Sequence, residues 1–452
     1  MERRAGRAAT LVVALIVLLV AGCSTAGDDA NAGNQGDQVG YGLHEPPVTI
    51  DFWYMPNGPD PDGVVRKEIA RFKQLHPNIT VRATKLEWAD ALTRLTTAAA
   101  GGSGPDVAQL GTTWVGGIAA LDALRQFSAT DLEGLGGREA FLPASWTATH
   151  LAGQADTVAV PWFVDVRAIF YRTDVLKSVG AEPATAFASW RSFEQTLAKI
   201  KATGRIAALG QPGKNDWNVV HNIAPFVWQA GGNFLSDDGA KAVLATPAAV
   251  DGVNYYQQLV AEYGSRQVLL RNTDDAETAF ADGKTAVVIT NPGVVAEFQA
   301  SKGAGVGKGW ATAPLPAGPK GRATFLGGSN LSIWKTAEHP KAAYEWVRFL
   351  LGEESQGRLV PAVGLWPARM AAASKPPFST NPAYRAFSEQ LQYGRQYPAV
   401  AAWTDVEGAL QREFSLMWDR VLKRNAPLPK REVEGLLTTA ATNIDGIIGQ
   451  SR

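Results

Sequence analysis

The segment VPWFVDVRAIFYR (160–172) is an apolar, aromatic run that carries two charged residues, Asp165 and Arg167, in its middle and ends on Arg172. Its composition predicts a buried β-strand. Because side chains alternate along a strand, Asp165 and Arg167 share a face with Phe163, whereas Trp162 and Val164 face the other way. Three roles are open for the charged residues: a catalytic carboxylate, an ion pair satisfied in the core, or the polar wall of a binding cleft.

Strands and helices alternate ahead of this segment. Strands are predicted at VTIDFWYM (48–55), ITVRAT (79–84) and DVAQL (106–110). Apolar residues recur between them at helical spacing, first from Val65 to Leu75 and then from Leu92 to Ala99. This order predicts a parallel sheet with helices on its faces. Ligands of such sheets bind beyond the carboxyl ends of the strands, here the loops MPNG (55–58) and GTTWVGG (111–117).

The alternation continues beyond the segment. Helices are expected over 190–200 and 341–352, and Phe280 should face inward on a helix that ends at a turn at 282–283. A strand over 325–334 is expected to be broken by Gly327 and Gly328, which suit a hinge bend or a close backbone approach.

The N-terminus has the pattern of an export signal. Arginines precede an apolar run that is too short to span a membrane, and Val20-Ala21-Gly22-Cys23 follows it. Cys23 is the only cysteine and stands where a bacterial lipobox places the acylated residue. Residues 1–22 are therefore expected to be a lipoprotein signal peptide, and the polar stretch 23–45 a flexible tether.

Composition narrows the functional class. The 452 residues suffice for two lobes with full cores, and 43 basic residues balance 43 acidic ones, with no basic stripe that would favour nucleic acid. Of the 14 tryptophans, Trp53, Trp190, Trp334 and Trp346 are expected in the core. No set of residues has the spacing of a metal site, and no cofactor motif is present in the sequence.

The order of these motifs resembles that of the extracellular solute-binding proteins of bacterial ABC importers, in the carbohydrate-binding family that includes the maltose binders. The similarity runs from about residue 46 to near the C-terminus. It rests on FKQLHPNITV, GPDVAQL, VPWFVDVRAIFYRTDVLKSVG, AFADGKTAVVITNPG, ATAPLPAGP, FLGGSNLSIWKTAEHPKAAYEWVRFLL and GLWPAR.

The resemblance implies two α/β lobes, a multi-strand hinge and a ligand cleft between the lobes. The first lobe would comprise residues 46–164 and a return segment, 319–355. The second would comprise 165–318 and the C-terminal helices, 356–452.

The resemblance also implies a ligand-binding set. The family's sugar-binding glutamate corresponds to Asp165, its charged pair after GPD is replaced by Thr113 and Trp114, and its stacking tryptophan is missing from NPGVV. The expected ligand-binding residues are Asn57, Thr112, Thr113, Trp114, Trp162, Asp165, Arg167, Trp217, His221, Asn222, Asn291, Gly327, Gly328, Ser329, Trp366, Arg369 and Trp403. Aromatic rings stack on the apolar faces of a sugar, and charged or amide groups bind its hydroxyls.

We therefore expect a lipid-anchored, monomeric protein on the outer face of the bacterial cytoplasmic membrane. It would capture a neutral mono- or oligosaccharide and deliver it to an ABC permease, with no catalytic residue, metal, cofactor or nucleic-acid partner. The alternatives are a secreted glycoside hydrolase, a tethered lectin-like adhesin, or a binder of another polar solute such as a polyol or peptide. A hydrolase needs two facing carboxyl groups, and Asp165 has no evident partner, although Asp405 and Glu407 are candidates.

Overall fold

The computed structural model describes residues 41–214 and 216–451. The expected signal peptide, Cys23 and most of the expected tether lie outside these residues. Among the described residues, no helix combines the length and apolar character that a membrane span requires.

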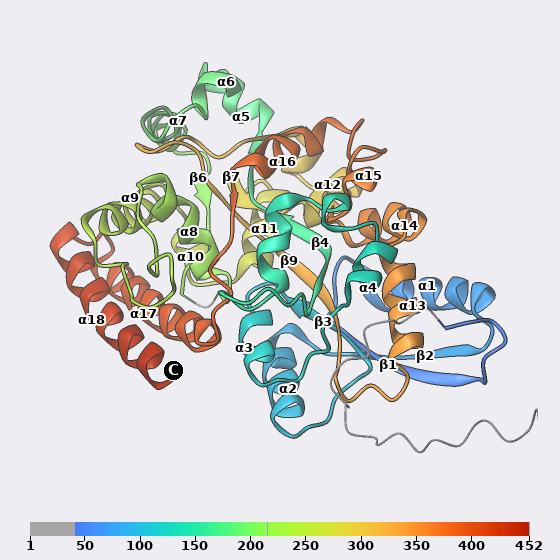
Figure 1. Ribbon diagram of the computed structural model, residues 1–452. Coiled ribbons are helices and arrows are strands. Elements are labelled where there is room, and N and C mark those ends of the chain that lie inside the picture. Colours follow the sequence, from blue (N-terminus) through green and yellow to red (C-terminus); the bar gives the residue numbers. More distant parts are fainter. Residues whose placement is uncertain (1–40, 215, 452) are drawn as a thin grey trace, which may run out of the picture. The chain divides into compact units, whose positions relative to one another are not determined.

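Two β-sheets organise the chain (Figure 1). The larger has the order β10-β4-β9-β3-β1-β2, with β11 paired to β9, and the smaller has the order β6-β7-β5-β8. The strands of the larger sheet are β1 (Val48–Tyr54), β2 (Ile79–Lys85), β3 (Val107–Gly111), β4 (Val160–Val166), β9 (Thr324–Ile333), β10 (Trp366–Pro367) and β11 (Gly394–Arg395). Those of the smaller sheet are β5 (Ala168–Arg172), β6 (Ala207–Gly210), β7 (Thr285–Thr290) and β8 (Trp310–Ala313).

Longer helices accompany the strands, and those that the periodicity predicts are among them. They are α1 (Pro61–Leu75), α2 (Trp88–Ala100), α7 (Trp190–Ala202), α8 (Val219–Gln229), α9 (Pro247–Tyr263), α11 (Thr273–Ala281), α13 (Pro340–Leu351), α14 (Glu353–Val363), α17 (Trp403–Arg424) and α18 (Lys430–Gln450). Shorter α-helices are α3 (Val115–Ala120), α4 (Ala129–Gly134), α5 (Thr173–Ser178), α6 (Pro183–Ala186), α10 (Arg266–Leu269), α12 (Val295–Ala300), α15 (Met370–Ala373) and α16 (Arg385–Gln390). Short 3₁₀ turns include η3 (Pro143–Thr149) and η4 (Pro292–Val294).

Local sequence explains where α1 begins and ends. The Asp60 side chain accepts a hydrogen bond from the Gly63 amide at 3.0 Å, and Pro61 occupies the first turn, where no amide hydrogen is needed. The helix stops at Leu75, two residues before Pro77. Phe72, on its buried face, packs against Trp346 of α13.

The opening segment joins the two sheets. β4 ends at Val166 in the larger sheet and β5 begins at Ala168 in the smaller one, so the chain changes sheets at Arg167. The larger sheet is mixed: β1 pairs in parallel with β2 and β3, as predicted, but β9 runs antiparallel to β3 and β4. Two sheet pairings differ from the expected lobes, because β10 pairs with β4 and β11 pairs with β9, although β10 and β11 fall within 356–452. The division into lobes otherwise stays a prediction.

The glycine pair does not break its strand, contrary to the sequence-based prediction. β9 is continuous from Thr324 to Ile333, and Gly328 adopts a φ of +122°. A Cβ atom on Gly328 would lie 2.2 Å from the Phe163 carbonyl oxygen. The glycine therefore permits the close backbone approach of β4 and β9, which was the other role considered for it.

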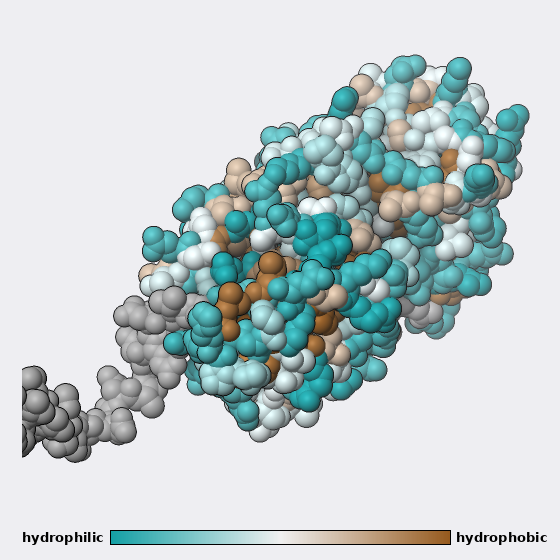
Figure 2. Space-filling model, turned by 90° about the vertical axis from the view of Figure 1, so that its right-hand side faces the viewer, coloured by the Kyte–Doolittle hydropathy of each residue, from teal (hydrophilic) through white to brown (hydrophobic). Residues whose placement is uncertain are grey.

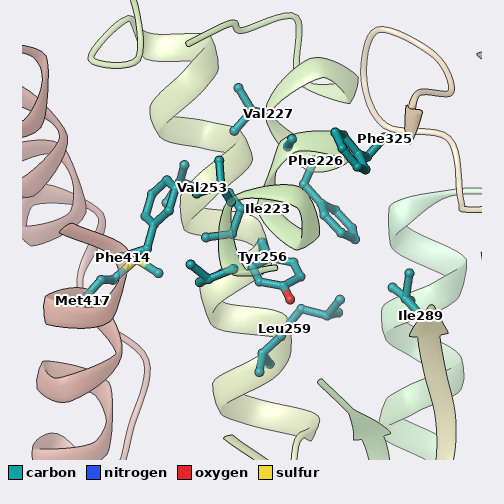
Figure 3. Packing of buried hydrophobic residues seen from close by; sticks show 14 of the residues in the cluster. Ile223, Phe226, Val227, Val253, Tyr256, Leu259, Ile289, Phe325, Phe414 and Met417 are labelled. Carbon is teal, nitrogen blue, oxygen red and sulfur yellow. The ribbon is translucent and has the colours of Figure 1, made fainter. Parts of the chain in front are cut away.

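Hydrophobic clusters pack against the sheets, and one of them includes residues of both sheets, such as Phe163 of β4 and Phe170 of β5. The cluster around the smaller sheet includes residues of α8, α9, α17 and α18. Figure 3 shows Ile223 of α8, Tyr256 of α9 and Met417 of α17 converging in it. Figure 2 shows one face of the surface, where hydrophilic residues predominate and hydrophobic ones gather in limited areas.

Of the four tryptophans expected in the core, Trp334 and Trp346 are buried, whereas Trp53 and Trp190 are only partly buried.

Candidate functional site

A buried arginine stands at the junction of the two sheets. The Nη2 atom of Arg167 donates hydrogen bonds to Asp165 at 3.0 Å and to Asn218 at 2.9 Å. The ion pair considered from the sequence therefore exists. It is incomplete, however, because Asp165 Oδ1 and the Arg167 Nε and Nη1 atoms are buried without a hydrogen-bond partner among the described residues. Buried polar atoms are normally paired, so these atoms are candidates for ligand contacts.

A chain of hydrogen bonds continues from Arg167. Asn218 donates to the hydroxyl of Thr273 at 3.3 Å, and that hydroxyl lies 3.0 and 3.1 Å from the two carboxylate oxygens of Asp216. Asn222 donates to Asp216 at 3.0 Å. Burial raises the pKa of Asp216, and the hydrogen bond from Thr273 opposes that rise. The network fixes the start of α8 and holds the Arg167 guanidinium in one orientation.

A second network surrounds His221. Its Nδ1 atom is 3.0 Å from the Tyr397 hydroxyl, and its Nε2 atom is 3.3 Å from Glu407 Oε1. Burial, aided by the Arg167 charge, lowers the pKa of His221 to about 3, while burial raises the pKa of Glu407 to about 7. The imidazole is therefore neutral at pH 7, and its contact with Glu407 is not a pair of full charges. The Trp403 ring nitrogen donates a hydrogen bond to Glu407 Oε2 at 3.0 Å. A hydrogen bond from the Thr113 side chain also stabilises the charged form of Glu407 and so opposes the rise of its pKa.

Three tryptophans lie beside these networks. The rings of Trp88 and Trp217 are nearly parallel, with centroids 6.0 Å apart, and Trp114 meets Trp88 at 5.5 Å, tilted by 62°. Trp217 also lies edge-on to His221. Trp88 begins α2, next to the larger sheet, whereas Trp217 precedes α8, which packs in the cluster around the smaller sheet. The Trp217 side chain is 53% exposed, which is unusual for a large aromatic and leaves its ring available for stacking.

A small cavity of about 10 Å³ lies next to Glu407, with room for roughly one water molecule. It is lined by Thr112, Thr113, Ala148, Phe325, Leu326, Gln396, Tyr397, Pro398, Ala399 and Trp403. Its walls come from the ends of β3 and η3, the start of β9, and the connection from β11 to α17. This volume is far smaller than the pockets that hold drug-sized molecules, so a sugar needs the surrounding segments to open.

About half of the sequence-predicted site residues meet here. Asp165, Arg167 and Asn222 belong to the first network, and Thr113, His221 and Trp403 to the second. Trp114 and Trp217 belong to the tryptophan group, and Thr112 lines the cavity.

The other predicted residues make structural contacts instead. Trp162 packs against Phe52 and Phe163, and Trp366 packs against Phe378 and Tyr384, so both are core residues and not cleft-facing aromatics. Both were expected at the cleft because strand alternation and loop position do not show which side of a mixed sheet is covered.

The remaining polar candidates are engaged locally. Asn57 donates to the Met55 carbonyl, Asn291 caps η4, and Ser329 accepts a hydrogen bond from Gln109. Arg369 lies over the Phe141 ring and donates to the Leu135 carbonyl. Gly327 and Gly328 lie within β9, opposite Asp165 and Val164.

Several site residues were missed from the sequence: Trp88, Asp216, Asn218, Gln396, Tyr397 and, as part of a binding site, Glu407. Three of them had a usable signal. Asp216 and Asn218 flank Trp217, and Glu407 follows Trp403 by four residues, which places the two on one helical face. Gln396 and Tyr397 had none, because they belong to an irregular connection.

Comparison with known proteins agrees with this geometry. Residues 56–357 match the family model of the bacterial extracellular solute-binding proteins, about two thirds of the chain. The chain belongs to this family. Members bind solutes and are not enzymes, which decides against the glycoside-hydrolase alternative. Among the described residues, no group of His, Cys, Asp or Glu is arranged to hold a metal ion.

Individual relatives extend the comparison over most of the molecule. The structure of the sugar-binding protein MalE from Xanthomonas citri superimposes with a TM-score of 0.76 at 25% identity, covering 89% of this chain and 98% of that one. The GacH receptor of Streptomyces glaucescens gives a TM-score of 0.74 at 22% identity, covering 88% of this chain and 99% of that one. The diacetylchitobiose-binding protein DasA of Streptomyces coelicolor is 25% identical over 414 residues, 88% of this chain and 90% of DasA. The solute-binding protein thus has the two-lobed α/β fold that the sequence predicts.

Proposed function

We propose that this solute-binding protein captures a neutral mono- or oligosaccharide outside the cell and delivers it to the permease of an ABC importer. The printed names of two relatives support a sugar: MalE of Xanthomonas citri is called sugar-binding, and DasA is called diacetylchitobiose-binding.

One observation carries the proposal: unpaired buried polar atoms stand near exposed aromatic surface. Asp165 Oδ1 offers an acceptor, and the Arg167 Nε and Nη1 atoms offer donors. The exposed ring of Trp217, which lies edge-on to His221, offers an aromatic face for stacking. Adjacent hydroxyls on a sugar ring supply both donors and acceptors, and the C–H face of the ring suits stacking.

The ligand would act by shifting the population of open and closed states. In the structure, Trp88 of α2 already contacts Trp217, and Thr113 lies beside Glu407 of α17. A sugar that contacts residues of both groups favours the state in which they are close. That state is the one we expect the permease to recognise.

We further propose that the protein is a monomer, anchored to the outer face of the cytoplasmic membrane through lipid on Cys23. The support is the lipobox-like sequence and the lipoprotein names of relatives, such as the maltooligosaccharide-binding lipoprotein of Streptococcus pneumoniae. Cys23→Ala should move the protein from the membrane fraction to the medium. Retention of this variant on membranes would refute the anchor.

Fluorescence titration tests the sugar proposal. Because Trp217 is exposed, a sugar stacked on it should change the tryptophan emission, and Trp217→Ala should weaken binding by about threefold to tenfold. Leu416→Ala is the matched control, since Leu416 is also exposed, by 50%, but lies on α17, whereas Trp217 precedes α8. Binding of only polyols or peptides from the same panel would replace the sugar with another polar solute.

A further inference from the structure

The cavity beside Glu407 contains one polar side chain that nothing satisfies. Both polar atoms of Gln396, Oε1 and Nε2, are buried without a hydrogen-bond partner among the described residues. Gln396 follows β11, where the chain leaves the larger sheet for α17. An unpaired buried amide costs free energy, so its retention at this place needs a cause.

Several other polar groups that line the cavity are engaged. The Tyr397 hydroxyl contacts His221 at 3.0 Å, and the Trp403 ring nitrogen donates to Glu407 at 3.0 Å. Thr113 lies beside the same carboxylate, and the Thr112 amide donates to the Gly328 carbonyl at 3.1 Å. The amide of Gln396 differs from them, because both of its buried polar atoms lack a partner among the described residues, and it is therefore available to a ligand.

The rest of the lining is apolar. Phe325, Leu326 and Trp403 are almost fully buried, and the Tyr397 ring stacks on Trp403 with centroids 4.2 Å apart. Ala148, Pro398 and Ala399 complete the wall. With a volume of about 10 Å³, the cavity accepts a group the size of a water molecule or a methyl.

These features select a particular chemical group. A ligand hydroxyl could pair with Gln396, but it would leave the apolar wall without a partner. An acetamido group has an N–H, a carbonyl oxygen and a terminal methyl, which match the amide oxygen, the amide nitrogen and the apolar wall in turn. We propose that this cavity receives the terminal methyl of the acetamido group of an N-acetylated amino sugar, and that the N–H and carbonyl of that group pair with the Gln396 amide. This inference rests on the proposed function and narrows its substrate class.

Matched ligand pairs test the inference directly. The full chain is titrated by calorimetry with N-acetylglucosamine against glucose, and with N,N′-diacetylchitobiose against cellobiose. Within each pair the sugars differ by acetamido groups in place of hydroxyls. We expect an acetylated member to bind at least about tenfold more tightly, as the satisfaction of a buried amide implies.

Variants of Gln396 assign the preference to the cavity. Gln396→Met keeps the side-chain length but removes both polar atoms, and should abolish the preference, so that the acetylated and plain members of each pair bind the variant with equal affinity. Gln396→Glu keeps an acceptor and removes the donor, so it should lose part of the preference; it also serves if the Met variant fails to fold. Gln392→Met is the control, because Gln392 is exposed, lies in the 3₁₀ turn Leu391–Tyr393 ahead of β11 and does not line the cavity.

The outcomes separate the two proposals. Equal affinity within each pair, or a preference that survives Gln396→Met, overturns the acetamido inference while sugar binding stands. Tight binding of a plain neutral sugar, with no measurable binding of the acetylated sugars, also overturns the acetamido inference. Failure of every saccharide to bind the unmodified protein overturns the proposed function and the inference with it.

Discussion

Arg167 shows how one residue connects the fold to the site. It occupies the single position between β4 and β5, its guanidinium is buried, and its charge influences the pKa of His221, Asp216 and Glu277. The alternation of the strand predicts that Arg167 and Asp165 share a face. Their further partner, Asn218, lies in a distant segment, so the sequence alone left the role of the pair open.

Removal of Arg167 should cost both stability and binding. Arg167→Met leaves Asp165 buried beside no cation, which typically destabilises a protein by about 3–5 kcal/mol. Denaturant unfolding measures the loss, and sugar titration should show no detectable binding. Arg191→Met, at an exposed arginine on α7, should change stability by less than about 0.5 kcal/mol. A stable Arg167→Met protein with normal affinity would contradict the assigned role.

The raised pKa of the buried Glu277 carboxyl group predicts that the stability of the protein depends on pH. Burial raises its pKa from 4.5 to about 8, and Thr290 donates a hydrogen bond to it. The folded state therefore holds a proton that the unfolded chain releases above pH 4.5, so the contribution of Glu277 to stability falls as pH rises from about 4.5 to 8.

Glu277→Gln removes this titration and keeps an acceptor for Thr290. The variant should match the wild type near pH 4 and exceed its free energy of unfolding by about 2–4 kcal/mol at pH 9. Urea titrations at both pH values measure the difference, with the exposed Glu434→Gln on α18 as control. A difference that does not change with pH would show that Glu277 titrates normally.

At the scale of elements, the pairing of β4 with β9 depends on a glycine. Gly328→Ala would place a methyl group against the Phe163 carbonyl and force a side chain into a positive φ, so we expect a loss of at least about 3 kcal/mol. Gly446→Ala offers the contrast, because nothing lies within 4 Å of its added Cβ on α18. That change should stabilise by about 0.5–1 kcal/mol. Thermal unfolding of both variants tests the comparison, and equal effects would refute it.

Most elements were predictable because their signals are local. The apolar periodicity of α1, α7 and α13 and the β-branched composition of β1 and β2 agree with the structure within a few residues. The continuity of β9 was not predictable from its glycines, because it depends on a partner strand more than a hundred residues away. The burial of Trp162 and Trp366 likewise depends on which side of the sheet other segments cover.

At the scale of the whole molecule, the site is assembled from segments that are remote in sequence. Trp88, Asp165, Trp217, Gln396 and Glu407 lie in five different stretches of the chain. The family resemblance could predict the architecture and the class of function, because these follow from the order of motifs. It could not predict the Glu407 network or the Gln396 cavity, because these arise from side chains at positions that carry no motif.

The most direct test of the account is calorimetric titration of the full chain with a panel of neutral saccharides, followed by chromatography of the recovered ligand. The account predicts that at least one saccharide binds one-to-one at micromolar affinity or tighter and is recovered unaltered. It also predicts that Arg167→Met abolishes the heat of binding. Absence of binding across the panel, or the appearance of a cleaved sugar, would contradict the account.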